Sequence, residues 1–172
     1  MEAFQHPYIS LAQESIHHFL NHREKLSCPD PLSKELKSRS GAFVSIKKLK
    51  QLRGCIGTLE PCAPNLAMEI IENALKAALH DPRFSPVTAE ELQYLTYSID
   101  VIQPLEKVSS VEELDHNTYG LVVRSNGKQG VLLPDLEGVN SIEEQIRICR
   151  AKGEIPDDEP VDMYRFKVDR FH

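Results

Sequence analysis

Apolar residues at helical spacing mark three segments of the chain. They recur every three or four positions from Ile9 to Leu20, which predicts an amphipathic helix over about residues 7–23. The segment from Asn65 to His80 is apolar on most of its sides and rich in alanine, so we expect a closely packed core helix. Residues 141–144, Ser-Ile-Glu-Glu, form a capping box that predicts another helix running to Lys152, and residues 88–91, Thr-Ala-Glu-Glu, form a capping box for a short helix.

Strict alternation of apolar and polar residues marks the strands. It predicts strands over residues 41–47 and 95–101, and the turn at 48–51 leads into a further strand that should pair with the first as a hairpin. Asn126-Gly127 is a strong signal for a second hairpin, and residues 162–171 read as one final strand. Helices placed among hairpins indicate an α+β fold, with a mostly antiparallel sheet packed with helices.

Length and composition indicate an ordinary globular protein. The 172 residues fit one domain, 1–172, and 41% of them are hydrophobic and 27% charged. No apolar run approaches the ~18 residues that span a bilayer, and residues 1–10 lack the features of a secretory signal. The four cysteines are far apart in sequence, which disfavours a disulfide framework. We therefore expect a cytoplasmic protein without a membrane contact.

The net charge of −6 argues against a nucleic-acid-binding module, because phosphate contacts require a basic surface. The charge is unevenly distributed, however. Residues 33–59 carry seven basic side chains and one acid, whereas residues 154–162 carry five acids and no base. The basic run would attract a small anionic ligand or an acidic partner, or it is simply a solvated edge of the sheet.

Residues 52–58, Leu-Arg-Gly-Cys-Ile-Gly-Thr, hold the leading candidates for chemistry. Glycine weakens a strand unless something approaches its backbone closely, so Gly54 and Gly57 would let another backbone or a peptide ligand approach the sheet. Strand alternation places Arg53, Cys55 and Gly57 on one face, where the guanidinium would favour the thiolate. Cys55 would then be a nucleophile with Arg53 as its cation. The alternative is that Cys55 is a small buried apolar residue.

A second candidate segment, Asp81-Pro82-Arg83-Phe84, follows the core helix directly. A proline-stiffened turn with an aspartate and an arginine can orient polar groups for a ligand, or Arg83 can cap the last carbonyls of the helix. The two candidate segments would meet if that helix packs on the strand of Arg53. Glu14, His18 and His22 form a helical stripe that is too long for one metal ion, and we expect no metal site and no cofactor.

The hexapeptide at residues 52–57 resembles the signature of the AMMECR domain family. The resemblance extends over nearly the whole chain: residues 41–45 resemble the preceding strand, residues 81–87 resemble the D-P-R-F-x-P-V segment, and residues 120–123 and 132–134 resemble a later hairpin. The chain departs from the pattern at Ala151-Lys152-Gly153, where K-A-G is usual, and it lacks the tryptophan often found beyond that point.

This resemblance implies a compact α+β domain with a major and a smaller lobe. It implies a functional role for Arg53, Gly54, Cys55 and Gly57 and, more weakly, for Asp81, Arg83 and Phe84. Similar prokaryotic proteins are commonly encoded beside, or fused to, Memo-like proteins and radical S-adenosylmethionine enzymes. The resemblance thus favours a substrate-presenting or assembly component that works through protein–protein interaction. The alternative is a thiol-dependent enzyme that uses Cys55 with Arg53.

Overall fold

The computed structural model describes residues 5–172, which form two compact units. The first unit holds the residues up to Ile102 together with Asp169–His172, and the second unit holds Gln103–Val168. The chain therefore leaves the first unit after β3 and returns to it at its C-terminal end.

The first unit is built on a four-stranded sheet in the order β2-β1-β3-β8, and β1 pairs antiparallel with both β2 and β3. Its elements are α1 (Pro7–His22), α2 (Lys34–Lys37), β1 (Ala42–Lys48), β2 (Gln51–Gly57), α3 (Leu66–Leu79), the 3-10 helix η1 (Ala89–Tyr94), β3 (Leu95–Ile102) and β8 (Val168–Phe171). The strand β2 lies at one edge of this sheet.

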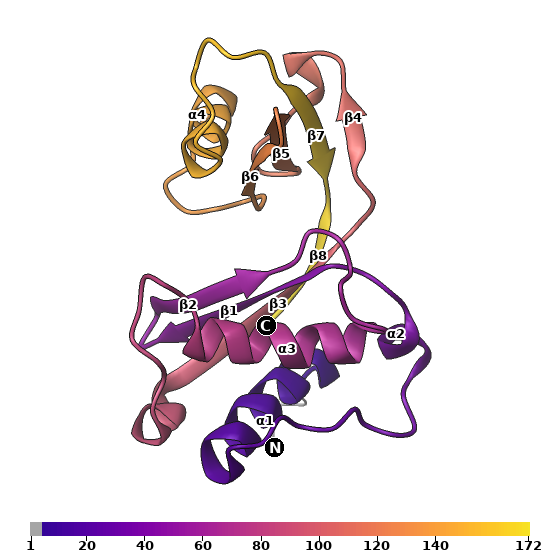
Figure 1. Ribbon diagram of the computed structural model, residues 1–172, viewed down its shortest axis with the longest axis vertical. Coiled ribbons are helices and arrows are strands. Elements are labelled where there is room, and N and C mark those ends of the chain that lie inside the picture. The colour runs from indigo at the N-terminus through magenta and orange to yellow at the C-terminus, as the bar shows by residue number, and fades with distance from the viewer. Residues whose placement is uncertain (1–4) are drawn as a thin grey trace. The chain divides into compact units, whose positions relative to one another are not determined.

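Helix α3 is the central element of the first unit. It packs on β1 and β2 on one side and on α1 on the other (Figure 1). Ala42, Val44 and Ile46 alternate along β1 and are fully buried in this core. Asn65 caps the first turn of α3 by accepting a hydrogen bond from the N–H of Met68 at 2.9 Å, as expected for a helix N-terminus. The core helix predicted from the sequence is thus confirmed.

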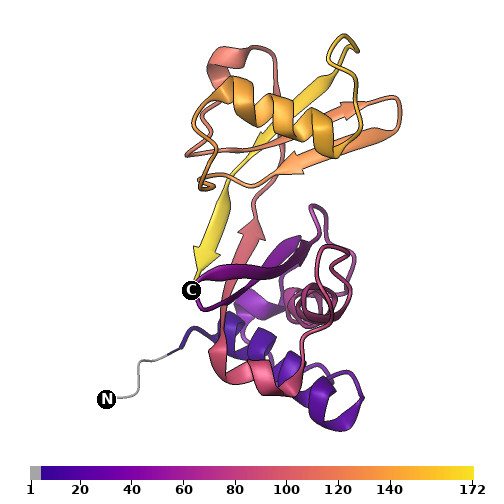
Figure 2. The ribbon, with the colours of Figure 1, turned by 90° about the vertical axis from the view of Figure 1, so that its left-hand side faces the viewer.

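The second unit has its own four-stranded sheet, in the order β4-β7-β5-β6, and α4 packs on β5 and β6 (Figure 2). Its core includes Leu121, Val123, Leu132 and Cys149. Its elements are β4 (Glu106–Val108), the 3-10 helix η2 (Val111–Glu113), β5 (Gly120–Ser125), β6 (Lys128–Leu132), α4 (Ile142–Lys152) and β7 (Asp162–Phe166).

The α+β class with antiparallel sheets is confirmed, but one predicted strand is wrong. Residues 162–171 form two strands in different sheets, because β7 pairs with β5 and β8 joins the sheet of β3. The strand-like pattern of the sequence continues across Lys167, so it does not reveal the break between β7 and β8. The short elements α2 and β4 were not predicted, since three or four residues are too few to display a period. No helix among residues 5–172 combines the length and the apolar surface needed to cross a bilayer.

Candidate functional site

The Asp81 carboxylate lies against the open edge of β2. Cys55 lies opposite Ser45 of β1 in the register, and its backbone N–H donates to Asp81 Oδ2 at 3.0 Å. Asp81 follows α3 directly and is only 4% exposed. A strand at the edge of a sheet leaves backbone groups without a strand partner, and these need another partner when they are buried. The Asp81 side chain supplies that partner.

Arg83 completes this arrangement. Its Nε and Nη2 donate to the two oxygens of Asp81 at 3.0 and 2.8 Å, and its backbone N–H donates to Oδ1 at 3.0 Å. Nη2 also makes a long contact of 3.5 Å with the carbonyl oxygen of Cys55. The Asp81–Arg83 pair therefore presents an acceptor to the N–H of Cys55 and a donor to its C=O, as a neighbouring strand would. The two candidate segments, which were expected to meet only if α3 packs on β2, are in contact here.

The pKa of Asp81 lies well below its ordinary value. The hydrogen bonds from the Arg83 side chain are the largest cause, and the backbone N–H groups of Cys55 and Arg83 act in the same direction, against the effect of burial. The pKa of Arg83 is raised, first by the hydrogen bonds to Asp81 and, in smaller part, by the electrostatic influence of Cys55. Asp81 and Arg83 are therefore held as a charged pair over the whole neutral range.

Arg53 forms the second ion pair of the site. Its Nε and Nη2 donate to the carboxylate of Glu91 at 2.9 and 3.1 Å, and its Nη1 donates to the carbonyl of Ser85 at 2.8 Å. The Arg53 side chain is 12% exposed and that of Glu91 14%. A forked, largely buried pair of this kind fixes both side chains in one geometry. Arg53 thus joins β2 to the chain that follows Phe84.

Glu91 makes two further contacts from η1. It accepts from Lys48 Nζ at 2.9 Å and from the N–H of Thr88 at 2.9 Å, which is the capping box predicted from the sequence. These contacts, with Arg53 as the largest cause, lower the pKa of Glu91 to about 2. One carboxylate therefore serves two cations and one helix end.

The prediction that successive residues of β2 alternate strictly between its two faces is wrong at Arg53. Gly54 pairs with Ile46, whereas Leu52 pairs with Lys47, so Arg53 has no residue opposite it and forms a bulge. The bulge places Leu52 on the same face as Cys55 by register. It also turns Arg53 to Glu91, so that the guanidinium is engaged by a carboxylate rather than by the Cys55 thiol.

The two glycines of the hexapeptide have packing roles within the chain. A Cβ on Gly54 would lie 2.1 Å from the backbone oxygen of Ala77 in α3, and a Cβ on Gly57 would lie 2.2 Å from the ring of Phe43. The close approach to β2 that Gly54 allows is therefore made by α3, not by an external peptide. Phe84, the last residue of the second segment, lies half-buried with its ring centroid 5.4 Å from the Arg83 guanidinium carbon.

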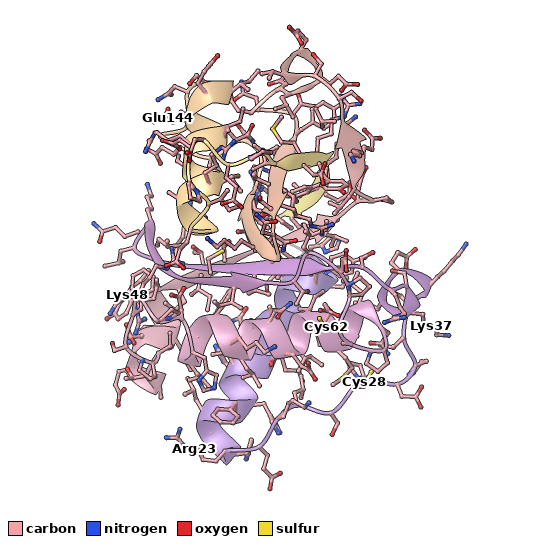
Figure 3. The ribbon with its side chains drawn as sticks, turned by 45° about the horizontal axis from the view of Figure 1, so that its top comes forward. Arg23, Cys28, Lys37, Lys48, Cys62 and Glu144 are labelled. Atoms are coloured by element: carbon pink, nitrogen blue, oxygen red, sulfur yellow. The ribbon has the colours of Figure 1, made fainter. Side chains whose placement is uncertain are left out.

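The Cys55 thiol is half-buried, and its Sγ lies 3.2 Å from Ser45 Oγ. The other cysteines lie elsewhere. Cys28 and Cys62 are exposed and lie by the N-terminal part of α3 (Figure 3), while Cys149 is buried in the second unit, where burial raises its pKa to about 12. Among residues 5–172, no three His, Cys, Asp or Glu side chains gather as they would around a metal ion.

Sequence reasoning missed Glu69 and Asn73, which fix the segment after the hexapeptide. The carboxylate of Glu69, 2% exposed, accepts from Thr58 Oγ1 at 2.5 Å and from the N–H groups of Cys62 and Ala63 at 3.0 and 2.7 Å. Asn73 Nδ2 donates to the carbonyl of Ala42 at 2.9 Å. Two polar residues four positions apart on an otherwise apolar helix face were the available signal.

Comparison with known proteins places the chain in a family. The AMMECR1 family model matches residues 9–171. A protein of Thermotoga maritima is 43% identical over 170 residues, which cover 97% of this chain and 98% of that protein. A protein of Clostridium acetobutylicum is 43% identical over 166 residues, which cover 95% of this chain but only 35% of that protein. The crystal structure of uncharacterized protein PH0010 from Pyrococcus horikoshii has a TM-score of 0.88 at 27% identity, covering 95% of this chain and 88% of that one.

Proposed function

Since this chain belongs to the AMMECR1 family, we propose that it is a non-catalytic component that presents a substrate or assembles a complex with Memo-like and radical S-adenosylmethionine proteins. The observation that carries this proposal is that the charged side chains of the site are bound to other groups of the chain. Arg53 joins β2 to η1 through its ion pair with Glu91, and Asp81, paired with Arg83, accepts a hydrogen bond from the N–H of Cys55 at the edge of β2. A catalytic group must be able to reach a substrate atom, and Arg53 and Asp81 are largely buried and engaged with the fold, whereas Arg83 is 54% exposed but bound to both oxygens of Asp81.

The Clostridium relative supports the assembly role. This chain covers 35% of that protein, so there the domain is one part of a longer polypeptide. Covalent linkage raises the effective concentration of one module for another, which is an advantage for components that act together. A domain that works by contact with a partner fits such an arrangement.

A co-purification experiment tests the proposal. The full chain, tagged at its C-terminus, is expressed in its native host and recovered at low salt, and the retained proteins are quantified by mass spectrometry against a tag-only control. We expect a Memo-like or a radical S-adenosylmethionine protein to be retained in roughly stoichiometric amount. If neither exceeds the tag-only control, the proposal fails.

The second candidate is a thiol-dependent enzyme that uses Cys55. Two observations favour it. Cys55 is half-buried rather than enclosed, and Arg83 lies close enough for the Cys55 thiol to contribute to the raised pKa of Arg83. In such an enzyme the cation that favours the Cys55 thiolate would be Arg83, and not Arg53 as the sequence suggested. The rate of Cys55 alkylation against pH separates the two functions. A midpoint well below the ordinary cysteine value near 8.5 favours the enzyme, and an ordinary or higher midpoint favours the binding component.

A further inference from the structure

The turn between β1 and β2 has a backbone conformation that its residues do not favour. Lys48 pairs with Gln51, so Leu49 and Lys50 form a two-residue loop, with φ of 50° and 70°. Positive φ at both positions is the signature of the type I′ hairpin turn, for which Asn-Gly is strongly preferred. A residue with a Cβ in this region costs about 1–2 kcal/mol. Leucine is an unfavourable choice here.

The same chain contains a second hairpin of this type with the favoured residues. Ser125 pairs with Lys128, and the loop residues Asn126 and Gly127 have φ of 47° and 77°. Turn geometry therefore explains the loop between β5 and β6 but not the residues between β1 and β2. Burial does not explain them either, since Leu49 is 71% exposed. A strained and exposed leucine points to a role outside the folded chain.

Leu49 belongs to a group of exposed apolar side chains. Leu52 is 44% and Tyr94 48% exposed, and the N–H of Leu49 donates to the carbonyl of Tyr94 at 3.3 Å. Lys47 stands opposite Leu52 in the register. Three of the four large exposed hydrophobic residues of the described chain thus lie at this end of the first sheet, and the fourth is Val111. We refer to Lys47, Leu49, Lys50, Leu52 and Tyr94 as the hairpin-tip surface.

The hairpin-tip surface carries excess positive charge. Lys47 and Lys50 are exposed, and Lys48, at the end of the hairpin (Figure 3), shares the single carboxylate of Glu91 with Arg53. Glu90, the residue before Glu91 in η1, is exposed and adds a second carboxylate. Four cations with two carboxylates leave a positive surface around a small apolar centre. An apolar centre with a charged rim is the usual composition of a protein-binding surface, and carboxylates complement this rim.

We propose that the hairpin-tip surface is the docking surface for a partner-protein segment in which acidic residues flank one or two large apolar side chains. Leu49 and Leu52 contact the apolar residues of that segment, and Lys47 and Lys50 contact its carboxylates. The type I′ turn holds Leu49 in a fixed, outward position before binding, which reduces the entropy lost on association. The inference rests on the proposed function in one respect, which is that the domain binds another protein.

A double variant tests the docking surface without damaging the fold. Leu49→Asn with Lys50→Gly installs the residues of the second hairpin, so it removes one apolar and one basic side chain while relieving the strain. Val111→Asn, which removes an exposed apolar side chain from η2, is the matched control. The probe is a fluorescein-labelled peptide of about 15 residues in which glutamates flank leucine and phenylalanine, followed by anisotropy. A second peptide with lysine in place of glutamate controls for charge.

We expect the acidic peptide to bind the wild-type protein and the Val111→Asn variant equally, and to bind the double variant about tenfold more weakly. Raising NaCl from about 50 mM to about 500 mM should weaken the wild-type interaction. No binding of the acidic peptide, equal binding of both peptides, or equal affinity for the double variant overturns the proposal. Concentration-dependent self-association of the chain that the double variant abolishes would also overturn it, because the occupant would then be a second copy.

The co-purification experiment separates this inference from the proposed function. If a Memo-like or radical S-adenosylmethionine protein is retained by the wild-type chain but equally by the double variant, the docking surface is wrong and the assembly role stands. If neither protein is retained while the acidic peptide binds at the hairpin tip, the surface stands and the proposed partners are wrong. Retention that the double variant selectively loses supports both.

Discussion

Replacement of Glu91 by glutamine tests whether the Arg53 ion pair stabilises the fold. Glu91 has a pKa of about 2 against its ordinary value of 4.5, with the hydrogen bonds from Arg53 as the largest cause. A shift of that size corresponds to roughly 3 kcal/mol at 1.36 kcal/mol per pKa unit. Because Lys48, the second cation, is 37% exposed, solvent screening lowers our expectation to about 2 kcal/mol.

The pH dependence of this effect follows from the sign of the shift. A carboxylate whose pKa is lowered in the folded state stabilises the protein fully above its unfolded pKa of 4.5, and the contribution disappears as the pH falls through about 2. Protonated Glu91 and glutamine leave Arg53 with the same uncharged partner. The stability gap between wild type and Glu91→Gln should therefore be about 2 kcal/mol near pH 7 and should close between about pH 4.5 and pH 2.

Urea unfolding followed by far-UV circular dichroism at a series of pH values measures this gap. Asp81 also titrates in the acid range, but it is present in both proteins and cancels in the difference. Glu90→Gln, one residue earlier in η1 and exposed, is the control and should leave the free energy of unfolding within about 0.5 kcal/mol of wild type. A gap for Glu91→Gln smaller than that, or one that does not change with pH, would refute a stabilising pair.

Three further predictions concern the packing around the site and the hairpin tip. Gly54→Ala should lower the free energy of unfolding by about 3 kcal/mol, because the added Cβ would meet the backbone of α3. Gly127→Ala is the control and should cost only about 1 kcal/mol, because its Cβ would meet no atom within 4 Å. Equal effects of the two variants in chemical denaturation would contradict the packing role of Gly54. Glu69→Gln should cost about 1–3 kcal/mol in the same assay, since its amide group faces N–H donors; a neutral result would mean that the buried carboxylate is not needed. Leu49→Asn with Lys50→Gly should raise the melting temperature, by relief of about 1–2 kcal/mol of backbone strain, and an unchanged or lower temperature would show that the turn is not strained.

Local sequence patterns predicted the elements that have a local cause. The apolar face of α3 and the Thr88–Glu91 capping box are set by residues a few positions apart, and both are present. The bulge at Arg53 was not predictable, because it arises from the pairing of β2 with β1 and leaves no mark in the alternation of β2 itself. The break between β7 and β8 likewise depends on which distant strand each half joins.

The sequence singled out residues of the candidate site but not the contacts between them. Arg53 was singled out because it stands beside a thiol and two glycines in a strand, and Asp81 because it stands with Arg83 on a proline-stiffened turn. Their partners lie far away in sequence, since Arg53 binds Glu91 and Asp81 binds the N–H of Cys55. Glu91 was visible from the sequence only as a capping residue. A side chain that serves a local cap and a distant ion pair at the same time cannot be recognised from local spacing.

The central claim is that the two motif segments form one structural unit at the edge of β2. Amide hydrogen exchange at Cys55, in the wild type and in Asp81→Ala, measures it most directly, with the amide of Ile99 in the buried strand β3 as the internal reference. We predict that the Cys55 amide is protected in the wild type, and that Asp81→Ala lowers its protection about tenfold relative to Ile99. A Cys55 amide that exchanges rapidly in the wild type, or equally in both proteins relative to Ile99, would contradict the account.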